Sequence, residues 1–241
     1  DDLPFPAWQL YDLKKYNKIS LSNRKSPPGY LETSRGCPWG CVFCNKNIQG
    51  RKFRPKSPRR LVDEIEYMLK AGFAEIDVLD DTFSTDINRA KAICDEIVKR
   101  GLKFPWHPLN GIRVDRVDKE LFIKMKRAGC YKVSFGIESG NQDVLARIDK
   151  GIKLQQVRDA VRWARETGFE TFGYFMIGLP GDTEETIKDT IRFAKELRLD
   201  IAKFNITIPL PGTKLFDEWD RSGLIKTKDW GKYNFYSLAS E

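Results

Sequence analysis

Short apolar runs alternate along this chain with longer segments in which apolar residues recur every three or four positions. Apolar side chains on consecutive positions are typical of strands buried on both faces of a parallel sheet, and the longer segments have the period of amphipathic helices. The pattern predicts six strands, at residues 29–34, 75–79, within 104–114, 131–137, 171–177 and 201–209. It predicts a helix that starts at Ser57-Pro58 and ends at Gly72, and further helices at residues 87–100, 119–128, 141–148, 154–167 and 183–197, with a short one within 8–16.

Strands that are each followed by helical material indicate an α/β fold with a parallel sheet, because the crossover connections of such units are right-handed. Six units predict a partial (β/α)6 barrel of the TIM type, and an open doubly wound sheet is the alternative. We expect the barrel core at residues 29–216. Residues 1–28 are expected to form an extended lead-in or linker, and residues 217–241 a C-terminal tail.

The composition is that of a globular protein with an excess of positive charge. No apolar run is long enough to span a bilayer, and the first residues lack the basic-then-apolar pattern of a signal peptide, so we expect a cytoplasmic protein. The formal net charge is +8. Basic residues are dense at 51–56 and 59–60, where a solvated surface is the favoured interpretation and a docking surface for an anionic partner the alternative.

Three of the five cysteines lie within one short stretch, at Cys37, Cys41 and Cys44. A structural zinc site needs four ligands, and the sequence offers no fourth cysteine or histidine at the usual spacing. A 4Fe-4S cluster is normally held by four cysteines, so three of them leave one iron open for chemistry. A zinc knuckle or redox loop is the alternative. Cys94 and Cys130 fall in predicted helical segments and are expected to be small buried hydrophobes.

The stretch CPWGCVFC at residues 37–44 resembles the cluster loop of the radical S-adenosylmethionine (radical SAM) superfamily, including the aromatic Phe43 before the third cysteine. The resemblance implies a 4Fe-4S cluster on Cys37, Cys41 and Cys44, with SAM chelating the open iron. It also implies reductive cleavage of SAM to a 5′-deoxyadenosyl radical that abstracts hydrogen from an organic substrate. The barrel is favoured over the open sheet because the cysteine loop follows the first predicted strand, as in the radical SAM partial barrel.

Polar residues at the ends of the second and third predicted strands are candidates for binding SAM, because barrel enzymes place their working residues at strand C-termini. The superfamily carries a Gly-Gly-Glu element after its second strand, whereas this chain has Asp80 and Asp81. Either carboxylate can accept hydrogen bonds from the SAM amino group, and either can cap a turn instead. Arg113 is expected to bind an anionic group of SAM or substrate. His107 is expected to have a hydrogen-bonded structural role, with proton transfer as the alternative.

Later strands supply further residues that the resemblance connects with SAM. Glu138 and Ser139 match the element that meets SAM near its ribose, and Lys150 occupies the place of a cation that pairs with the SAM carboxylate. Ile177 and Gly178 match the region that lines the adenine. The alternatives are a salt bridge from Glu138 to a neighbour and an exposed Lys150.

The motifs SRGCPWGCVFC, LDDTFSTD, FGIESGNQDVLARIDKGI, GYFMIGLPGDTEETI and FNITIPLPGTKLFDEW together resemble the branch of the superfamily that carries a cobalamin-binding domain, such as anaerobic magnesium-protoporphyrin monomethyl ester cyclase. The resemblance implies a cobalamin-dependent methylase or cyclase system, hence an oxidoreductase or transferase. The same resemblance implies a small-molecule organic substrate and an electron donor of flavodoxin or ferredoxin type. It also implies cobalamin on a domain or subunit outside this chain. The alternatives are a methylthiotransferase of tRNA or ribosomal protein and a non-catalytic iron–sulfur electron carrier.

Overall fold

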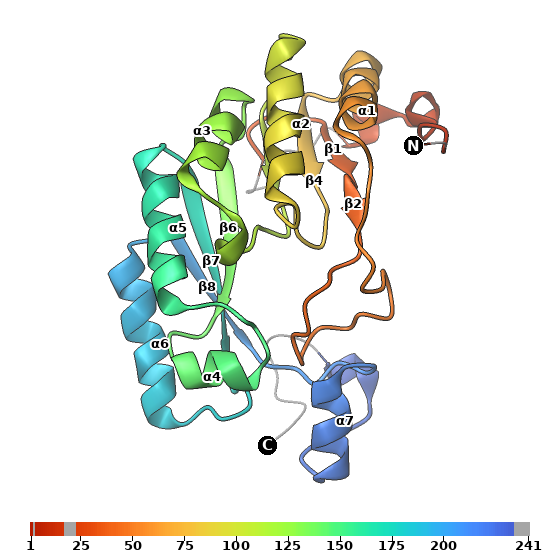
Figure 1. The fold of residues 1–241 in the computed structure, drawn as a ribbon. Helices are drawn as coiled ribbons and strands as arrows, with labels where there is room; N and C mark the ends of the chain where they lie inside the picture. Colours follow the sequence, from red (N-terminus) through yellow and green to blue (C-terminus); the bar gives the residue numbers. More distant parts are fainter. Residues whose placement is uncertain (2, 17–22, 234–241) are drawn as a thin grey trace.

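The computed structural model describes residues 1, 3–16 and 23–233, and six parallel strands form its centre (Figure 1). One three-stranded sheet has the order β1-β4-β5, and a second has the order β6-β7-β8. The strand bounds are Pro28–Leu31 for β1, Glu75–Val78 for β4, Trp106–Pro108 for β5, Lys132–Glu138 for β6, Glu170–Ile177 for β7 and Ile201–Ile206 for β8. The prediction of six strand–helix units in an α/β partial barrel is confirmed.

Seven helices connect and cover these strands, and most lie on the outer side of the sheets (Figure 1). Helix α1 shows why they begin and end where they do: the Ser57 side chain accepts from the Arg60 amide, and Gly72 ends the helix in the left-handed conformation. The bounds are Pro58–Ala71 for α1, Ile87–Lys99 for α2, Lys119–Arg127 for α3, Gln142–Arg147 for α4, Leu154–Glu166 for α5, Glu184–Leu197 for α6 and Lys214–Arg221 for α7.

The two sheets meet along a sparse seam. Strand β5 is much shorter than the predicted range, and only two isolated parallel bridges, Trp106 to Cys130 and Ile112 to Phe135, link its side of the barrel to β6. Proline at position 108 removes an amide donor, so continued pairing is not available there. Cys130 therefore lies in the connection to β6, and its assignment to a helical segment is wrong.

Strand β4 presents apolar side chains to the helices and polar ones to the barrel interior. Ile76 and Val78 belong to the apolar core, whereas Glu75 and Asp77 alternate with them and point to the other face. All four side chains are buried. The interior beside β4 is therefore polar. The sequence pattern had predicted strands that are apolar on both faces, and the buried Glu75 and Asp77 depart from that prediction.

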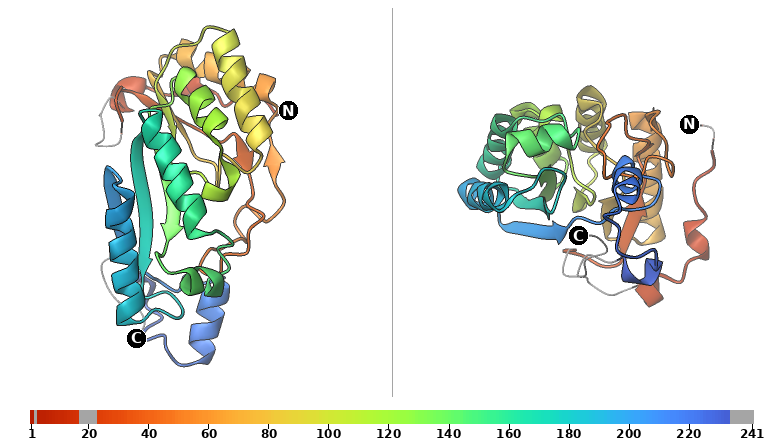
Figure 2. Two further views of the ribbon diagram at one scale, coloured as in Figure 1. Left: turned by 60° about the vertical axis from the view of Figure 1, so that its left-hand side comes forward. Right: turned by 90° about the horizontal axis from the view of Figure 1, so that it is seen from below.

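Several short elements frame the barrel. The lead-in forms two 3-10 helices, Trp8–Leu10 and Leu13–Tyr16, where one short helix was expected. A small antiparallel ladder of β2 (Ser34–Arg35) and β3 (Arg54–Pro55) had no counterpart in the predictions. Helix α7 crosses the predicted boundary between core and tail, and it lies beyond the C-terminal ends of the strands (Figures 1 and 2). No helix in the described ranges has the length and apolar character needed to cross a membrane.

Candidate active site

The loop with the three closely spaced cysteines leaves the barrel after β1 and is closed at its base by β2 and β3. Arg35 pairs with Arg54 across this ladder. Two residues further in, the Cys37 amide donates to the carbonyl oxygen of Gly50 at 3.2 Å. These bonds fix both ends of the loop, while most of its interior has no regular secondary structure.

Gly36 connects the ladder to the first cysteine, and no other residue fits its position. Its φ of +87° lies in the left-handed region, and a Cβ there would collide with the carbonyl oxygen of Lys52. Its amide donates to Oδ2 of Asp81 at 3.1 Å. Gly36 therefore lets the loop turn tightly beside the end of β4.

The three thiols line one open cavity of about 170 Å³, which lies where the barrel strands end. Cys37 and Cys41 are buried, and Cys44 is exposed. Five other residues that the sequence singled out line the same cavity, namely Phe43, Asp81, Arg113, Glu138 and Lys150. The structure thus brings together residues from both three-stranded sheets and from the cysteine loop.

The cavity thiol of Cys41 lies near positive charges, whereas the thiols of Cys94 and Cys130 lie in the apolar core. Burial raises the pKa of the Cys41 thiol, but the positive charges of Lys150 and Arg113 oppose this effect. Burial raises the pKa of Cys94 and Cys130 well above the ordinary value. Both thiols belong to the apolar core, as predicted, and they are neutral groups that are remote from the cavity lining.

The cavity offers three thiols and no fourth ligand of the kind that a structural zinc site requires. Tetrahedral zinc with Zn–S bonds of 2.3 Å holds its sulfurs about 3.8 Å apart. Within the described residues, the only three potential metal ligands whose donor atoms all lie within 4.8 Å of one another are Glu75, Asp77 and His107. No fourth cysteine or histidine lines the cavity. Three thiols around an open cavity with no fourth protein ligand fit a four-iron cluster with one iron free of protein ligands.

Glu138 and Lys150 form a buried ion pair at the cavity wall. Lys150 Nζ donates to Glu138 Oε1 at 2.6 Å. Lys150 is 7% exposed and Glu138 is 8% exposed. Glu138 has a φ of +69°, a strained conformation for a residue with a side chain. Strand β6 is irregular between Gly136 and Glu138. The salt-bridge alternative for Glu138 is what the structure shows, and the alternative of an exposed Lys150 is wrong.

Gly136 makes room for this pair at the cavity wall. A Cβ at this position would lie 2.8 Å from Glu138 Oε1 and 3.1 Å from Lys150 Nζ. Both charged groups therefore face the cavity across a residue that has no side chain. An incoming ligand with a carboxylate or hydroxyl groups can reach them there.

Arg113 ties three segments together at the cavity edge. Its Nη2 donates to the carbonyl oxygen of Lys150 at 2.8 Å, and its Nε donates to Asp115 Oδ1 at 2.9 Å. The guanidinium lies 4.2 Å from the centre of the Trp39 ring in the cysteine loop. Asp115 compensates part of its charge, so Arg113 both organises the wall and contributes positive potential to the cavity.

The two aspartates after β4 have different surroundings. The carboxylate of Asp80 is buried and accepts from the amides of Thr33 and Ser34 at 2.5 and 3.0 Å, and from both of their hydroxyls. Asp80 does not line the cavity. Asp81 is exposed, lines the cavity and bonds only the Gly36 amide among the described residues. Asp81 is therefore the aspartate that faces the cavity, and Asp80 holds the start of β2.

Ser139, Ile177 and Gly178 are not brought to the cavity. The Ser139 hydroxyl is buried and shares a hydrogen bond with the Thr190 hydroxyl at 3.1 Å, so it attaches the end of β6 to α6. Gly178 donates its amide to Asp182 Oδ2 at 2.9 Å in the turn after β7. Contact of these three residues with SAM stays a prediction.

Sequence reasoning missed several cavity residues. Lys46 follows the third cysteine by two positions, and its Nζ lies 3.2 Å from Cys44 Sγ. Asn110 donates its side-chain amide to the carbonyl oxygens of Leu79 and Asp80 at 3.0 and 3.2 Å. Its place just after β5 was the available signal. Thr82, Gly111, Ile112 and Gly136 complete the set of missed lining residues.

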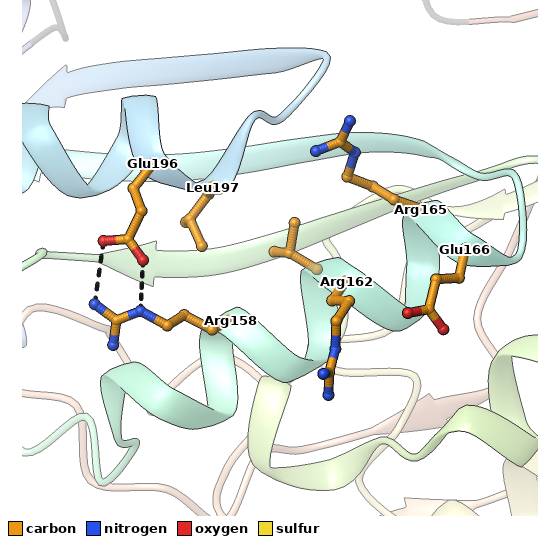
Figure 3. A pocket seen from close by; sticks show the side chains of 7 residues that line it. Arg158, Arg162, Arg165, Glu166, Glu196 and Leu197 are labelled. Carbon is orange, nitrogen blue, oxygen red and sulfur yellow. Dashed lines mark hydrogen bonds and ion pairs between the residues drawn. The ribbon is translucent and has the colours of Figure 1, made fainter.

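A second hollow, of about 470 Å³, lies between α5 and α6 on the outer helix layer (Figure 3). Arg158 faces Glu196 there and donates to it at 2.6 Å from Nε. Arg162 is paired with Asp159. This groove contains no thiol and shares no residue with the cysteine cavity, so it is not the candidate active site.

Comparison with known protein families identifies the family to which this chain belongs. The model of the radical SAM superfamily matches residues 31–194, which include the cysteine loop and all charged residues of the cavity wall. The chain belongs to the radical SAM superfamily. Its resemblance to that superfamily in the cysteine motif is thereby confirmed.

The similar radical SAM proteins include methyltransferases and cyclases. An uncharacterized methyltransferase of Pyrococcus horikoshii is 38% identical over 235 residues, which are 97% of this chain and 50% of that protein. The anaerobic magnesium-protoporphyrin IX monomethyl ester cyclase of Rubrivivax gelatinosus is 31% identical, over 95% of this chain and 41% of that protein. The chain spans about half the length of these relatives. The predicted resemblance to the cyclase branch is confirmed.

Among solved structures, the radical SAM methyltransferase TsrM from Kitasatospora setae, with cobalamin and a 4Fe-4S cluster bound, aligns with a TM-score of 0.72 at 22% identity. The alignment covers 90% of this chain and 43% of TsrM. This likeness supports the partial-barrel fold.

His107, the only histidine of this radical SAM chain, is fully buried. Its Nδ1 lies 2.9 Å from Asp77 Oδ1, in a network with Glu75 and Tyr131, and the residue does not line the cavity. The predicted structural role agrees with this position.

Proposed function

We propose that this chain is the catalytic core of a radical SAM enzyme that reductively cleaves SAM and uses the resulting 5′-deoxyadenosyl radical to abstract hydrogen from an organic substrate. One observation carries the proposal. Three thiols of a single loop border the same cavity as the Glu138–Lys150 pair and Arg113, and no fourth thiol or imidazole lines that cavity in the described chain. An electron carrier would normally complete its cluster with a fourth cysteine, so the structure does not favour that alternative.

The residues of the cavity have complementary roles in this proposal. Cys37, Cys41 and Cys44 hold the cluster, which supplies the electron that breaks the sulfonium of SAM. Lys150 offers a cation to the SAM carboxylate. Asp81 is an acceptor for the amino group, and Glu138 is an acceptor for the ribose hydroxyls.

The proposal extends to the system in which the core works. The similarity to methyltransferases and to a cyclase supports a cobalamin-dependent methylation or cyclisation of a small organic molecule, with cobalamin held outside the described residues. A one-electron donor of flavodoxin or ferredoxin type would reduce the cluster. We place the protein in the cytoplasm, because a labile cluster with free thiols requires a reducing compartment.

Product analysis under anaerobic conditions tests the proposal. Protein reconstituted with iron and sulfide, incubated with SAM and a chemical reductant, is expected to form 5′-deoxyadenosine and methionine. Cys37→Ala, Cys41→Ala and Cys44→Ala should each lose the cluster and the product, whereas Cys94→Ala and Cys130→Ala should keep both. Cluster-loaded protein that binds no SAM and forms no deoxyadenosine would support the electron carrier, and stoichiometric zinc after anaerobic purification would contradict the cluster.

A further inference from the structure

The positive charge of this chain is concentrated in the segment that contains the cysteine loop. Residues 33–62 contain eight basic residues and no acidic one. Subtracting these eight from the 42 basic residues of the chain leaves 34, which equals the number of acidic residues. The segment therefore accounts for the whole net charge of +8, and the rest of the chain is balanced.

Basic residues on the helices are compensated locally. Arg100 of α2 donates to Asp63 of α1 at 2.6 Å, and Lys124 of α3 donates to Asp95 of α2 at 2.7 Å. Such pairs leave little field beyond the helix surface, because exposed charges are screened within about a Debye length of 10 Å at 0.1 M salt. The helices are therefore not the source of a long-range attraction.

The cysteine loop has exposed cations without such partners. We define the basic loop face as Arg51, Lys52 and Arg54 together with Ile48, all of them exposed. Arg54 donates only to the carbonyl oxygens of Lys52 and Gln49, at 3.0 and 2.7 Å. Across the part of the chain that the structure describes, none of the three cations forms an ion pair with a carboxylate. Ile48 is 79% exposed and adds an apolar contact point.

This face is adjacent to the cluster ligands. It begins four residues after Cys44, the exposed thiol, and the Gly50 amide donates to the Lys46 carbonyl oxygen at 2.8 Å. Lys46 in turn contacts the Cys44 sulfur. A protein bound to the basic loop face is thus separated from a cluster ligand by a single turn of chain. The loop runs below β2 toward α7 (Figure 1).

We propose that the basic loop face binds a small acidic one-electron carrier protein that reduces the cluster. The inference rests on the proposed function, since it presupposes a cluster on the three cysteines. In the transfer the carrier loses one electron and the oxidised cluster gains it, with no bond broken and no proton moved. Charge complementarity argues for an acidic partner, and one apolar residue among cations provides the short-range contact.

A nucleic acid is the less suitable partner. Recognition of nucleic acid uses an extended basic stripe and stacking of bases on exposed aromatic side chains. Here the cations occupy one loop, and its aromatic residues, Trp39, Phe43 and Phe53, are all half-buried. An electron carrier must bind close to the cluster ligand Cys44, and the basic loop face meets this requirement. Binding of a nucleic acid does not need that proximity.

The test compares two reductants on the cluster-loaded protein in a stopped-flow experiment. One is a reduced acidic flavodoxin, and the other is photoreduced 5-deazariboflavin, a small reductant that does not depend on docking. The variant Arg51→Glu/Lys52→Glu reverses two charges of the face. Lys99→Glu/Lys103→Glu makes the same change of net charge at the far end of α2, where Lys99 is exposed (Figure 1).

We expect Arg51→Glu/Lys52→Glu to slow reduction by flavodoxin at low ionic strength by about 10-fold or more, as is typical for loss of electrostatic steering. The control pair should change this rate by less than about 2-fold, and the rates should converge near 1 M salt, where the Debye length is about 3 Å. Reduction by deazariboflavin, and deoxyadenosine formed with it, should stay at the wild-type level in both.

Equal slowing in the control pair, or a wild-type flavodoxin rate in the face variant, would overturn the docking proposal while leaving the proposed function intact. If the face variant does not retain its cluster, the wild-type protein decides alone, because a flavodoxin rate independent of ionic strength contradicts steering. Salt-sensitive binding of a labelled RNA that is lost in the face variant, with unchanged flavodoxin rates, would assign the face to nucleic acid. Absence of deoxyadenosine with deazariboflavin in the wild type would instead refute the proposed function.

Discussion

Replacing each of the two adjacent aspartates after β4 separates fold stability from ligand binding. Asp80→Ala removes the acceptor of the amides of Thr33 and Ser34, both of which are buried. The two hydroxyls that also bond Asp80 can turn to other acceptors, but the amides cannot. At about 1–3 kcal/mol for each buried donor left unsatisfied, the loss of stability should be about 4 kcal/mol.

The isosteric variant Asp80→Asn tests whether the hydrogen bonds or the charge matter more. Its remaining oxygen keeps both amides, and its new NH2 group can donate to the two hydroxyl oxygens, whose own protons then turn to other acceptors. Only the additional strength of bonds to a charged acceptor is lost, which amounts to about 1–2 kcal/mol in total. Asp81→Ala removes one bond from an exposed carboxylate and should cost about 1 kcal/mol or less.

Thermal unfolding and SAM titration of the same preparations distinguish the roles. At about 2–4 °C per kcal/mol for a chain of this size, Asp80→Ala should lower Tm by about 8–16 °C, and Asp80→Asn by about 2–8 °C. Asp81→Ala should keep Tm within about 4 °C of the wild type and weaken SAM binding. The reasoning is refuted if Asp80→Ala keeps the wild-type Tm, or if it weakens SAM binding while Asp81→Ala does not.

Two further changes probe the cavity wall and the cysteine loop. Lys150→Ala and Glu138→Ala should each weaken SAM binding by about 1–3 kcal/mol in calorimetry without loss of iron, because each removes a charged partner; unchanged affinity in both would remove them from the SAM site. Gly36→Ala should lower the iron content on reconstitution, because its Cβ meets the Lys52 carbonyl. Gly101→Ala, at a positive φ in open space, is the control and should retain full iron.

Local signals were sufficient for most of the fold. Helix α1 could be predicted because Ser57, Pro58 and Gly72 each act within one turn of the chain. The length of β5 and the existence of β3 could not, because both depend on pairing with distant segments. Strand β3 has only two residues, and it forms because the cysteine loop returns to Arg35. The structure of residues 234–241, part of the predicted tail, lies outside the described residues.

The position of Asp80 was within reach of sequence reasoning, and the position of Ser139 was not. Side chains alternate along a strand, so Asp80 continues the face of Ile76 and Val78, which is the helix side. Asp81 then falls on the cavity side. Glu138 has a positive φ where β6 becomes irregular, and this changes the direction of the chain immediately before Ser139. Alternation therefore cannot be extended past that point.

The geometry of the cavity depends on the backbone of one residue of the cysteine loop. The thiols come from a loop attached to the first sheet, whereas Glu138 and Lys150 follow the second, and only two isolated bridges join the sheets directly. Val42 lies between two of the cysteines, and its amide donates to the Ile148 carbonyl oxygen at 3.1 Å while its carbonyl oxygen accepts from the Leu215 amide at 3.0 Å. This residue thus connects the loop to the end of α4 and to the start of α7. Because the bonds are made by the backbone, side-chain identity at this position does not reveal them. The distance between the thiols and the Glu138–Lys150 pair is consequently set by three chain segments that the sequence separates widely, and binding of one ligand to both halves of the site would strengthen the seam between the sheets.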